Sequence, residues 1–346
     1  MYNVLDTAWL TINRKCNFSC LWCYGEKTCD NNDMSLSLAM ELIELLHELG
    51  VKKIILTGGE PTIHKNFFDI INYIEKKKIS TTVISNGYMF CDDIFVANVL
   101  ASKLQTIRVS IKAGNKEQFI KTTKHDSYEN IRVAIKNLAH LKVMKKLTVH
   151  YSITISKYNI HNIEQLIDLA MIDNDFIGIS LSFGVNQLDK DGNIVNEVID
   201  DPKEIINLLW MKYPIIHKRT KGKIFLAQTY PDCMWPKDFL TLLNERKQLR
   251  NKGCGLTSRR GLVFDVDGTV IPCDFLWLLP LGKYKKHFNC AEEFINFWQQ
   301  QDMLDFYKKI SQIVVDKPNL FFNNKKTGGC PVYWLTDRVL SSVALK

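Results

Sequence analysis

The feature that most restricts the fold of this 346-residue chain is a repeated alternation of strand-like and helix-like segments. Short alternating or β-branched runs are followed by longer segments with helical periodicity. Such repetition predicts a parallel sheet covered by helices, with right-handed crossovers. Six strand–helix units in about 180 residues fit a partial or full barrel, and we predict an α/β fold, a partial (β/α)6 TIM-like barrel. The expected strands are 7–13, 53–56, 81–84, 106–112, 147–155 and 177–183, and the expected helices are 34–49, 67–77, 96–104, 128–141 and 163–170.

Four short motifs stand at the carboxyl ends of the first four predicted strands. They are CNFSCLWC at 16–23, GGEP at 58–61, SNG at 85–87 and SIK at 110–112. Active sites in parallel α/β sheets lie at the carboxyl ends of the strands. The four motifs are therefore expected to meet at one site.

Cys16, Cys20 and Cys23 have the spacing C-x3-C-x2-C. Structural zinc sites need four protein ligands, usually in separated C-x2-C pairs, whereas several thiolates in one loop suit an iron–sulfur cluster. Three cysteines for four irons would leave one iron open for chemistry. The alternative is a structural zinc site that includes Cys29. Ten cysteines without a secretory signal indicate a reducing compartment, so we expect a cytoplasmic protein.

With Trp22 as its aromatic residue, the cysteine loop resembles the C-x3-C-x-aromatic-C signature of the radical S-adenosylmethionine (SAM) superfamily. The resemblance implies that Cys16, Cys20 and Cys23 bind a [4Fe-4S] cluster whose open iron chelates SAM. It also implies that Glu60 helps to hold the methionine ammonium group, while SNG and SIK correspond to positions that contact the ribose and carboxylate of SAM. The implied cofactor-binding residues are Trp22, Gly58, Gly59, Glu60, Pro61, Ser85, Asn86, Ser110 and Lys112.

The activity implied by this resemblance is reductive cleavage of SAM to methionine and a 5′-deoxyadenosyl radical, which abstracts hydrogen from a substrate. The cofactors would carry this chemistry, while the protein binds, orients and excludes water. A one-electron reductant such as flavodoxin or ferredoxin is the implied partner.

The periodic pattern fades after residue 183, and the polar segment 186–200 is expected to be a loop or hairpin. We therefore expect a barrel domain at 1–215 and a smaller α+β domain at 220–346. In the second, the Asp-Gly pair at 267–268 between strand-like runs predicts a β-hairpin. A hairpin with cysteines near both ends resembles the start of a SPASM or twitch domain, an extension that holds auxiliary iron–sulfur clusters.

A full SPASM domain continues with a dense run of cysteines that this chain lacks. The resemblance therefore implies one auxiliary [4Fe-4S] cluster, with Cys254, Cys273 and Cys330 as ligands. For the fourth ligand we favour Cys233 over Cys290, which stands in an amphipathic segment that could bury its thiol. An open fourth position and complete loss of the cluster remain alternatives.

The segment FDVDGTV at 264–270 also matches the loop of haloacid-dehalogenase-type phosphatases, in which Asp265 would be the nucleophile and Asp267 the general acid/base. That reading needs a helix and further parallel strands after the motif, and fewer than eighty residues remain. The hairpin explains the same residues, so it is favoured.

Other polar aromatic side chains have weaker signals. His64 and Tyr24 are candidates to line the SAM pocket. His150 and Tyr151 are adjacent in one predicted strand, so only one of them can face the barrel interior.

The leading function is modification of a ribosomally made precursor peptide or protein by cross-linking, epimerisation or oxidation, because SPASM-type extensions are common on such enzymes. The alternative is a radical SAM dehydrogenase or related enzyme that acts on a small molecule. A third reading, a catalytically silent metal-binding protein, conflicts with the intact motifs. No membrane span and no nucleic-acid partner are expected, and a solvated lysine-rich surface is the favoured explanation of the net charge of +8.

Overall fold

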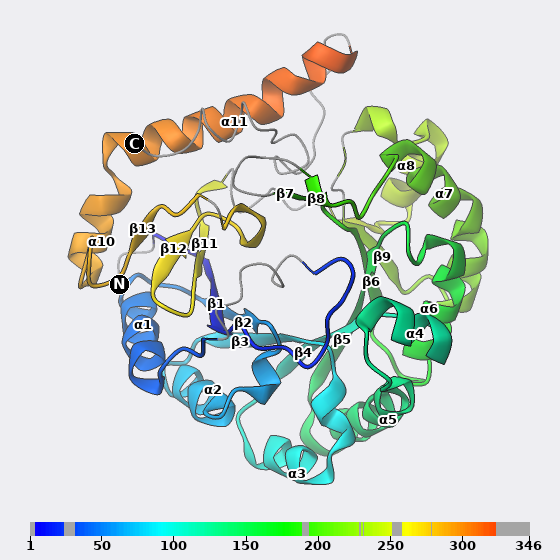
Figure 1. Ribbon diagram of the computed structural model, residues 1–346, viewed down its shortest axis with the longest axis horizontal. Coiled ribbons are helices and arrows are strands. Elements are labelled where there is room, and N and C mark those ends of the chain that lie inside the picture. The colour runs from blue at the N-terminus through cyan, green and yellow to red at the C-terminus, as the bar shows by residue number, and fades with distance from the viewer. Residues whose placement is uncertain are drawn as a thin grey trace.

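The computed structural model describes residues 4–23, 32–188, 194–227, 230, 232–250, 258–277 and 279–322. Its main sheet has eleven strands in the order β10-β9-β6-β5-β4-β3-β2-β1-β11-β12-β13, and helices cover its outer face (Figure 1). Since β10 and β13 stand at opposite ends of this order, the described sheet is not closed. The predicted α/β partial barrel is confirmed. The strands are β1 (Thr7–Asn13), β2 (Lys53–Gly58), β3 (Ser80–Ser85), β4 (Thr106–Ile111), β5 (Thr148–Ile155), β6 (Ile179–Phe183), β9 (Ile224–Ala227), β10 (Leu249–Arg250), β11 (Gly261–Phe264), β12 (Thr269–Ile271) and β13 (Gly282–Lys283).

Helices α1 to α8 connect the parallel strands and lie outside the sheet, as expected for right-handed crossovers, whereas α10 and α11 follow the last strand. The short α4 was not expected, because its sequence KEQFIKTT has too few apolar residues to show helical periodicity. The α-helices are α1 (Leu36–Glu48), α2 (Phe67–Lys76), α3 (Asp93–Ala101), α4 (Lys116–Thr123), α5 (Tyr128–Lys145), α6 (Ile163–Ala170), α7 (Pro202–Arg219), α8 (Lys237–Glu245), α10 (Ala291–Trp298) and α11 (Gln301–Phe322).

The C-terminal hairpin extends the barrel sheet beyond β1. Strand β11 pairs in parallel with β1, from Thr7 opposite Gly261 to Leu10 opposite Phe264. The next pairs, β11–β12 and β12–β13, are antiparallel. The hairpin predicted around the Asp-Gly pair is confirmed, and the antiparallel β12 stands where the phosphatase reading requires a parallel α/β unit.

Alternation along the strands separates two faces of the barrel wall. On β5 every second residue is buried beneath the helices, and the residues between them are partly exposed toward the barrel interior. Tyr151 belongs to the buried set, and its hydroxyl donates to Asp173 Oδ2 at 3.1 Å. His150 is therefore the member of this pair that lies on the interior face.

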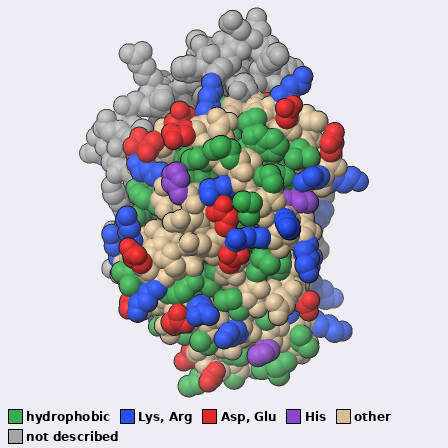
Figure 2. Space-filling view, turned by 90° about the vertical axis from the view of Figure 1, so that its right-hand side faces the viewer, with side chains coloured by type: hydrophobic (Ala, Val, Ile, Leu, Met, Phe, Trp, Pro, Cys, Tyr) green, Lys and Arg blue, Asp and Glu red, His purple; other side chains and the backbone are tan. Residues whose placement is uncertain are grey.

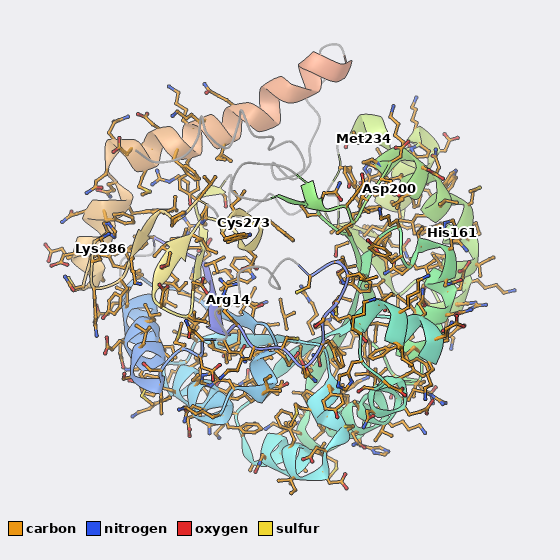
Figure 3. The ribbon with its side chains drawn as sticks, in the orientation of Figure 1. Arg14, His161, Asp200, Met234, Cys273 and Lys286 are labelled. Atoms are coloured by element: carbon orange, nitrogen blue, oxygen red, sulfur yellow. The ribbon has the colours of Figure 1, made fainter. Side chains whose placement is uncertain are left out.

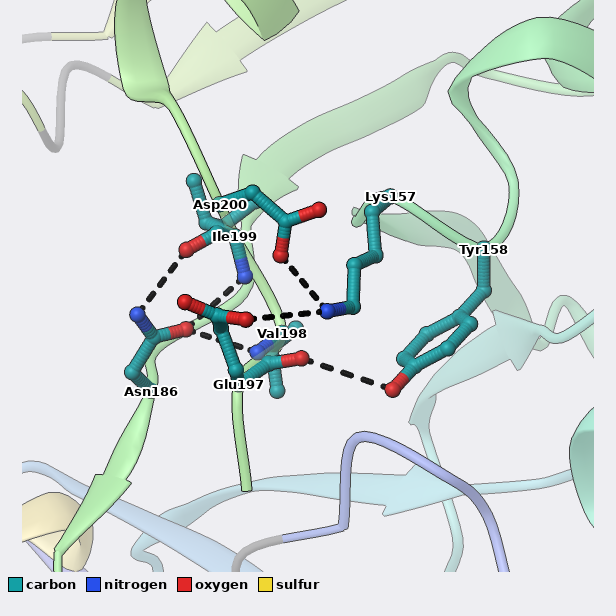
Figure 4. Close-up of polar contacts among 7 residues, drawn as sticks. All are labelled: Lys157, Tyr158, Asn186, Glu197, Val198, Ile199 and Asp200. Atoms are coloured by element: carbon teal, nitrogen blue, oxygen red, sulfur yellow. Dashed lines mark hydrogen bonds and ion pairs between the residues drawn. The ribbon is translucent and has the colours of Figure 1, made fainter. Parts of the chain in front are cut away.

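A second hairpin, formed by β7 (Gln187–Leu188) and β8 (Ile194–Asn196), follows β6. Its base is fixed to the loop after β5 by polar contacts (Figure 4). Lys157 Nζ contacts Asp200 at 2.6 Å and Glu197 at 3.2 Å, and Asn186 Oδ1 accepts from the amides of Val198 and Ile199. The hairpin expected within 186–200 is confirmed.

The surface over the helices on the right-hand side of Figure 1 carries interspersed positive and negative side chains (Figure 2). None of the described helices combines the length and the apolar character needed to cross a membrane.

Candidate active site

A cavity of about 500 Å³ opens inside the barrel and gathers residues from the four sequence motifs. All three cysteines of the loop line it. Of the predicted cofactor-binding residues, Pro61 is the one that is not in its lining, because it is buried in the short 3-10 helix Pro61–Ile63. The other predicted residues that line the cavity are Trp22, Gly58, Gly59, Glu60, Ser85, Asn86, Ser110 and Lys112.

The two glycines of GGEP allow β2 to approach the start of the cysteine loop. The amide of Gly59 donates to Asn13 O at 3.0 Å, and the amide of Glu60 donates to Lys15 O at 2.8 Å. A Cβ on Gly59 would lie 2.1 Å from Lys15 O, and one on Gly58 would lie 2.4 Å from Asn13 O. Both distances are far below van der Waals contact. These glycines are therefore required by the chain's own backbone, whatever ligand the cavity binds.

The carboxylate of Glu60 holds the GGEP and SNG segments together. Oε1 accepts from Ser85 Oγ at 2.7 Å and from the amide and hydroxyl of Thr62, and Oε2 accepts from the Asn86 amide at 2.6 Å. Burial raises the pKa of Glu60 above its ordinary value, although these donors oppose the shift. Because a carboxylate oxygen has two lone pairs, Oε2 keeps acceptor capacity for a cationic ligand.

Asn86 connects the SNG loop to the cysteine loop. Its Nδ2 donates to Asn17 Oδ1 at 2.7 Å, and its Oδ1 accepts from the Tyr88 amide at 2.9 Å. Gly87 supplies the left-handed conformation of this turn, with φ of +84°. The three motifs thus form one hydrogen-bonded unit at the carboxyl ends of β1, β2 and β3.

The far side of the cysteine loop is anchored on α4. The amides of Ser19 and Leu21 each donate, at 2.9 Å, to the carbonyls of Thr123 and Thr122. Phe18 packs edge-to-face on Phe119 of the same helix, with ring centroids 5.4 Å apart. The unexpected α4 is therefore part of the support of the site.

The three thiols differ in their surroundings. Cys20 is buried, Cys23 is partly buried and Cys16 is exposed. Although the residue as a whole is exposed, poor solvation of its thiol in the cavity lining is the main cause that raises the pKa of Cys16 to about 12, and the nearby Glu60 adds to it. A protonated thiol is a poor ligand, and a bound metal supplies the positive charge that favours the thiolate.

The donor set is compatible with an iron–sulfur cluster. In the described part of the chain, no three His, Cys, Asp or Glu residues form a group that could hold one metal ion. A cubane cluster offers a different iron to each thiolate, so its ligands need not converge on one point. Asn17 Nδ2 is buried without a hydrogen-bond partner among the described residues, which leaves a donor beside Cys16 for an acceptor such as sulfide.

Lys112 and Ser110 lie where β4 ends. Lys112 Nζ donates to Ser110 Oγ at 2.9 Å, and both side chains line the cavity. Arg108, two residues earlier on the same face, also lines it and was not anticipated. The sequence signal that could have identified it is the period of two along β4, which places Arg108 on the same face as Ser110.

His64, a candidate to line the SAM pocket, is not in the lining of the described cavity. Its Nε2 contacts Met34 O at 3.0 Å, and its Nδ1 accepts from the Asn66 amide at 3.1 Å. Both ring nitrogens are used to fix the loop after GGEP to the segment before α1. Tyr24 lies outside the described residues, as does Cys29.

The cysteines predicted to bind an auxiliary cluster are only partly covered by the structure. Cys254 and Cys330 lie outside the described residues, and only the backbone of Cys233 is described. Cys273 is partly buried after β12, on the side of the barrel where Arg14 also lies (Figure 3). Cys290 is exposed at the N-cap of α10, so the expectation that its helix buries the thiol is wrong. The N-cap residue precedes the buried face of the helix.

Each aspartate of the DVDG turn is engaged in an ion pair. Asp265 contacts Arg14, and Asp267 contacts Lys283 Nζ at 2.5 Å and accepts from the Thr269 amide at 3.0 Å. The hairpin thus accounts for both carboxylates that the phosphatase reading would need.

Known proteins resemble the chain in sequence. The family model described as the radical SAM superfamily matches residues 10–170. The GTP 3′,8-cyclase of Helicobacter pylori strain J99 is 24% identical over 339 residues, 95% of each chain. A probable GTP 3′,8-cyclase of Thermoplasma volcanium is 28% identical over 165 residues, 46% of this chain and 49% of that protein. The first four relatives are matched over 34–49% of their own lengths.

Solved structures of low sequence identity share the fold. The Streptococcus suis protein SuiB, bound to precursor peptide SuiA, has a TM-score of 0.63 at 15% identity, covering 88% of this chain and 66% of that one. The protein anSMEcpe, with bound AdoMet and a Cp18Cys peptide, has a TM-score of 0.65 at 14% identity, covering 98% and 96%. Together with the family match, the cysteine spacing and the open parallel barrel, these similarities identify residues 10–170 as a radical SAM domain.

Proposed function

We propose that this protein is a radical SAM enzyme that modifies a ribosomally made precursor peptide or protein. Cys16, Cys20 and Cys23 would hold the [4Fe-4S] cluster that a radical SAM domain implies. The single observation that carries the proposal is the cavity in which these thiols meet GGEP, SNG and the end of β4. When bound, the cluster and SAM supply one-electron reductive cleavage of SAM to a hydrogen-abstracting 5′-deoxyadenosyl radical.

The chain's own residues would bind and orient the cofactors. Glu60, already fixed by Ser85 and Asn86, would accept a hydrogen bond from the methionine ammonium group through Oε2. Lys112 and Ser110 would contact the carboxylate or ribose of SAM. Trp22 is largely buried and would shield the cavity from water.

A peptide substrate is supported by two structural neighbours of the same fold, SuiB bound to precursor peptide SuiA and anSMEcpe with bound AdoMet and Cp18Cys peptide. In this chain the peptide would enter between a barrel domain (1–215) and a C-terminal domain (220–346). Cross-linking, epimerisation and side-chain oxidation are all open as outcomes. A flavodoxin or ferredoxin would supply the electron, and the protein would work in the cytoplasm.

A small-molecule substrate is the second candidate. The H. pylori GTP 3′,8-cyclase matches 95% of this chain, so one relative of known small-molecule activity shares nearly the whole length. On this reading the enzyme would act on a nucleotide or a similar compound in the same cavity.

The experiment that separates the two candidates has two arms, a co-expression in cells and an assay of anaerobically reconstituted enzyme with SAM and a reductant. One arm co-expresses a short precursor peptide encoded beside the gene and looks for a change in peptide mass. The other arm supplies GTP without peptide and looks for its consumption. A mass change supports the peptide proposal, and turnover of GTP alone would replace it with the second candidate.

One auxiliary [4Fe-4S] cluster, held by Cys254, Cys273, Cys330 and a fourth ligand that we assign to Cys233, is part of the proposal. With one auxiliary cluster, reconstituted protein should contain about eight irons, since each cubane has four. About four irons would mean that the C-terminal cysteines hold no cluster, and about twelve would mean a second auxiliary site.

A further inference from the structure

The wall of the cavity formed by β4, β5 and β6 carries two layers of hydroxyl groups. Ser110 stands opposite Ser152, and Ser152 stands opposite Ser180 on the next strand. One layer higher, Thr154 stands opposite Ser182. All five side chains line the cavity. Such regular placement of Ser and Thr gives the wall many adaptable hydrogen-bonding groups.

Arg108 adds a permanent positive charge to this wall. It lies two residues deeper in the barrel than Ser110, opposite His150 on β5, and lines the cavity. The other lysine or arginine in the described lining is Lys112, and the acidic residue there is Glu60. The Glu60 carboxylate accepts hydrogen bonds from Thr62, Ser85 and Asn86.

Apart from Ser110, the wall is distinct from the residues proposed to bind SAM. Those residues lie on the cysteine loop and at the carboxyl ends of β2, β3 and β4. Arg108 and the hydroxyls of β5 and β6 are outside that set, and the lining also includes the aromatic rings of Phe225 and Phe275. A ligand here would place acceptor oxygens on the hydroxyls and an apolar part against the two aromatic rings.

We propose that Arg108, with Ser152 and Ser180, binds an anionic group of the substrate, a carboxylate or a phosphate. This inference rests on the proposed function, because it assigns Ser110 and Lys112 to SAM and the rest of the wall to the substrate. The planar guanidinium group forms paired hydrogen bonds with either kind of oxyanion. The hydroxyl of Ser180 supplies a further donor, and Ser152 supplies one when its hydroxyl turns from Val109 O, to which it donates at 3.4 Å. Arg108 thus determines which substrates the barrel accepts.

The test uses anaerobic enzyme loaded with SAM and isothermal titration with two anionic probes, GTP and tetraglutamate. Their uncharged counterparts are guanosine and tetraglutamine. At least one anionic probe should bind in a 1:1 ratio and at least about tenfold more tightly than its counterpart. Preference for GTP identifies a phosphate subsite, and preference for tetraglutamate identifies a carboxylate subsite.

Substitution of Arg108 locates the interaction. R108Q should lower the affinity for the preferred probe by about tenfold or more. R108K should retain only part of the affinity, because a lysine cannot form the paired contact. The double substitution S152A/S180A keeps the positive charge of Arg108 and should lower the affinity for the preferred probe by several fold. R132Q, in which an exposed arginine paired with Glu129 is changed, should behave as wild type.

Two results would overturn the inference. One is that neither anion binds more tightly than its counterpart up to about 10 mM, a concentration that detects even weak complexes. The other is that R108Q lowers the affinity for SAM as much as the affinity for the probe, which would place Arg108 in the cofactor pocket. Formation of 5′-deoxyadenosine by the same wild-type preparation is measured in parallel, so loss of the proposed function would be seen separately.

Discussion

Arg14 and Asp265, 251 positions apart in the sequence, form an ion pair at the carboxyl ends of two neighbouring parallel strands. Only 10% of the Arg14 side chain and 18% of the Asp265 side chain are exposed. Arg14 is the second residue before Cys16, and Asp265 begins the turn of the C-terminal hairpin. The hairpin is thereby fixed to the start of the cysteine loop.

Replacing Asp265 with Asn should therefore destabilise the protein measurably. Because the pair is mostly shielded from water, D265N should lower the free energy of unfolding by about 2 kcal/mol, between the values for exposed and buried pairs. D267N is the matched control: the Asp267–Lys283 pair is largely exposed and should contribute less than about 1 kcal/mol. Urea denaturation of the two variants compares them, and equal losses would contradict a special role for Asp265.

Asp274 should make stability depend on pH. Burial raises the pKa of Asp274 to about 6, and Asp265 adds to the shift while Arg14 opposes it. A carboxyl whose pKa is higher in the folded state contributes most below its ordinary pKa of about 4, and loses that contribution as the pH rises through 6. The difference in free energy of unfolding between D274N and wild type should therefore shift in favour of D274N by on the order of 2 kcal/mol between pH 4 and pH 8. Denaturation of the cluster-free proteins at both pH values measures this, and parallel profiles would show that the shift is absent.

Glu60→Gln tests the assignment of Glu60 to the SAM ammonium group. The substitution keeps the shape of the side chain but removes its charge, so SAM affinity should fall by about tenfold or more. Equilibrium dialysis with labelled SAM measures the change in reconstituted protein. E129Q, at an exposed carboxylate on α5, should bind SAM like wild type. Unchanged SAM affinity in E60Q would leave Glu60 a purely structural residue.

Gly59→Ala should disrupt the junction between β2 and the cysteine loop. Its new Cβ would meet the carbonyl of Lys15 at 2.1 Å, and backbone cannot be moved as cheaply as a side chain. We expect a loss of about 3 kcal/mol of stability and a lower cluster content after reconstitution. The control is G222A, whose new Cβ would lie 3.3 Å from its nearest neighbour, a side-chain atom. Its expected loss of stability is therefore only the roughly 1 kcal/mol that a non-glycine residue costs in the left-handed conformation. Equal losses in the two variants, by thermal denaturation and iron assay, would contradict the steric argument.

Local sequence patterns were sufficient for much of the barrel. The strand expected at 7–13 and the helix expected at 163–170 coincide with β1 and α6, since hydrophobic periodicity reports directly on which face is buried. Helix α4 escaped prediction because its stability depends on what it packs against, including Phe18 of the cysteine loop.

The candidate site was predictable only where residues cluster along the chain. The three cysteines form one local motif and GGEP forms another, and the cysteines line the cavity with Gly58, Gly59 and Glu60. The Arg14–Asp265 pair joins residues that only the folded sheet brings together, and the sequence has no local sign of it. Arg108 carries no motif either, although its spacing from Ser110 placed it on the same face of β4.

The central claim is that the loop at 16–23 holds a cluster that drives reductive cleavage of SAM. The most direct measurement is the yield of 5′-deoxyadenosine from SAM, under reducing and oxygen-free conditions, for the wild type and for the triple variant C16A/C20A/C23A. The account predicts 5′-deoxyadenosine from the wild type and none from the triple variant, with circular dichroism showing that both are folded. A folded triple variant that still produces 5′-deoxyadenosine would contradict it.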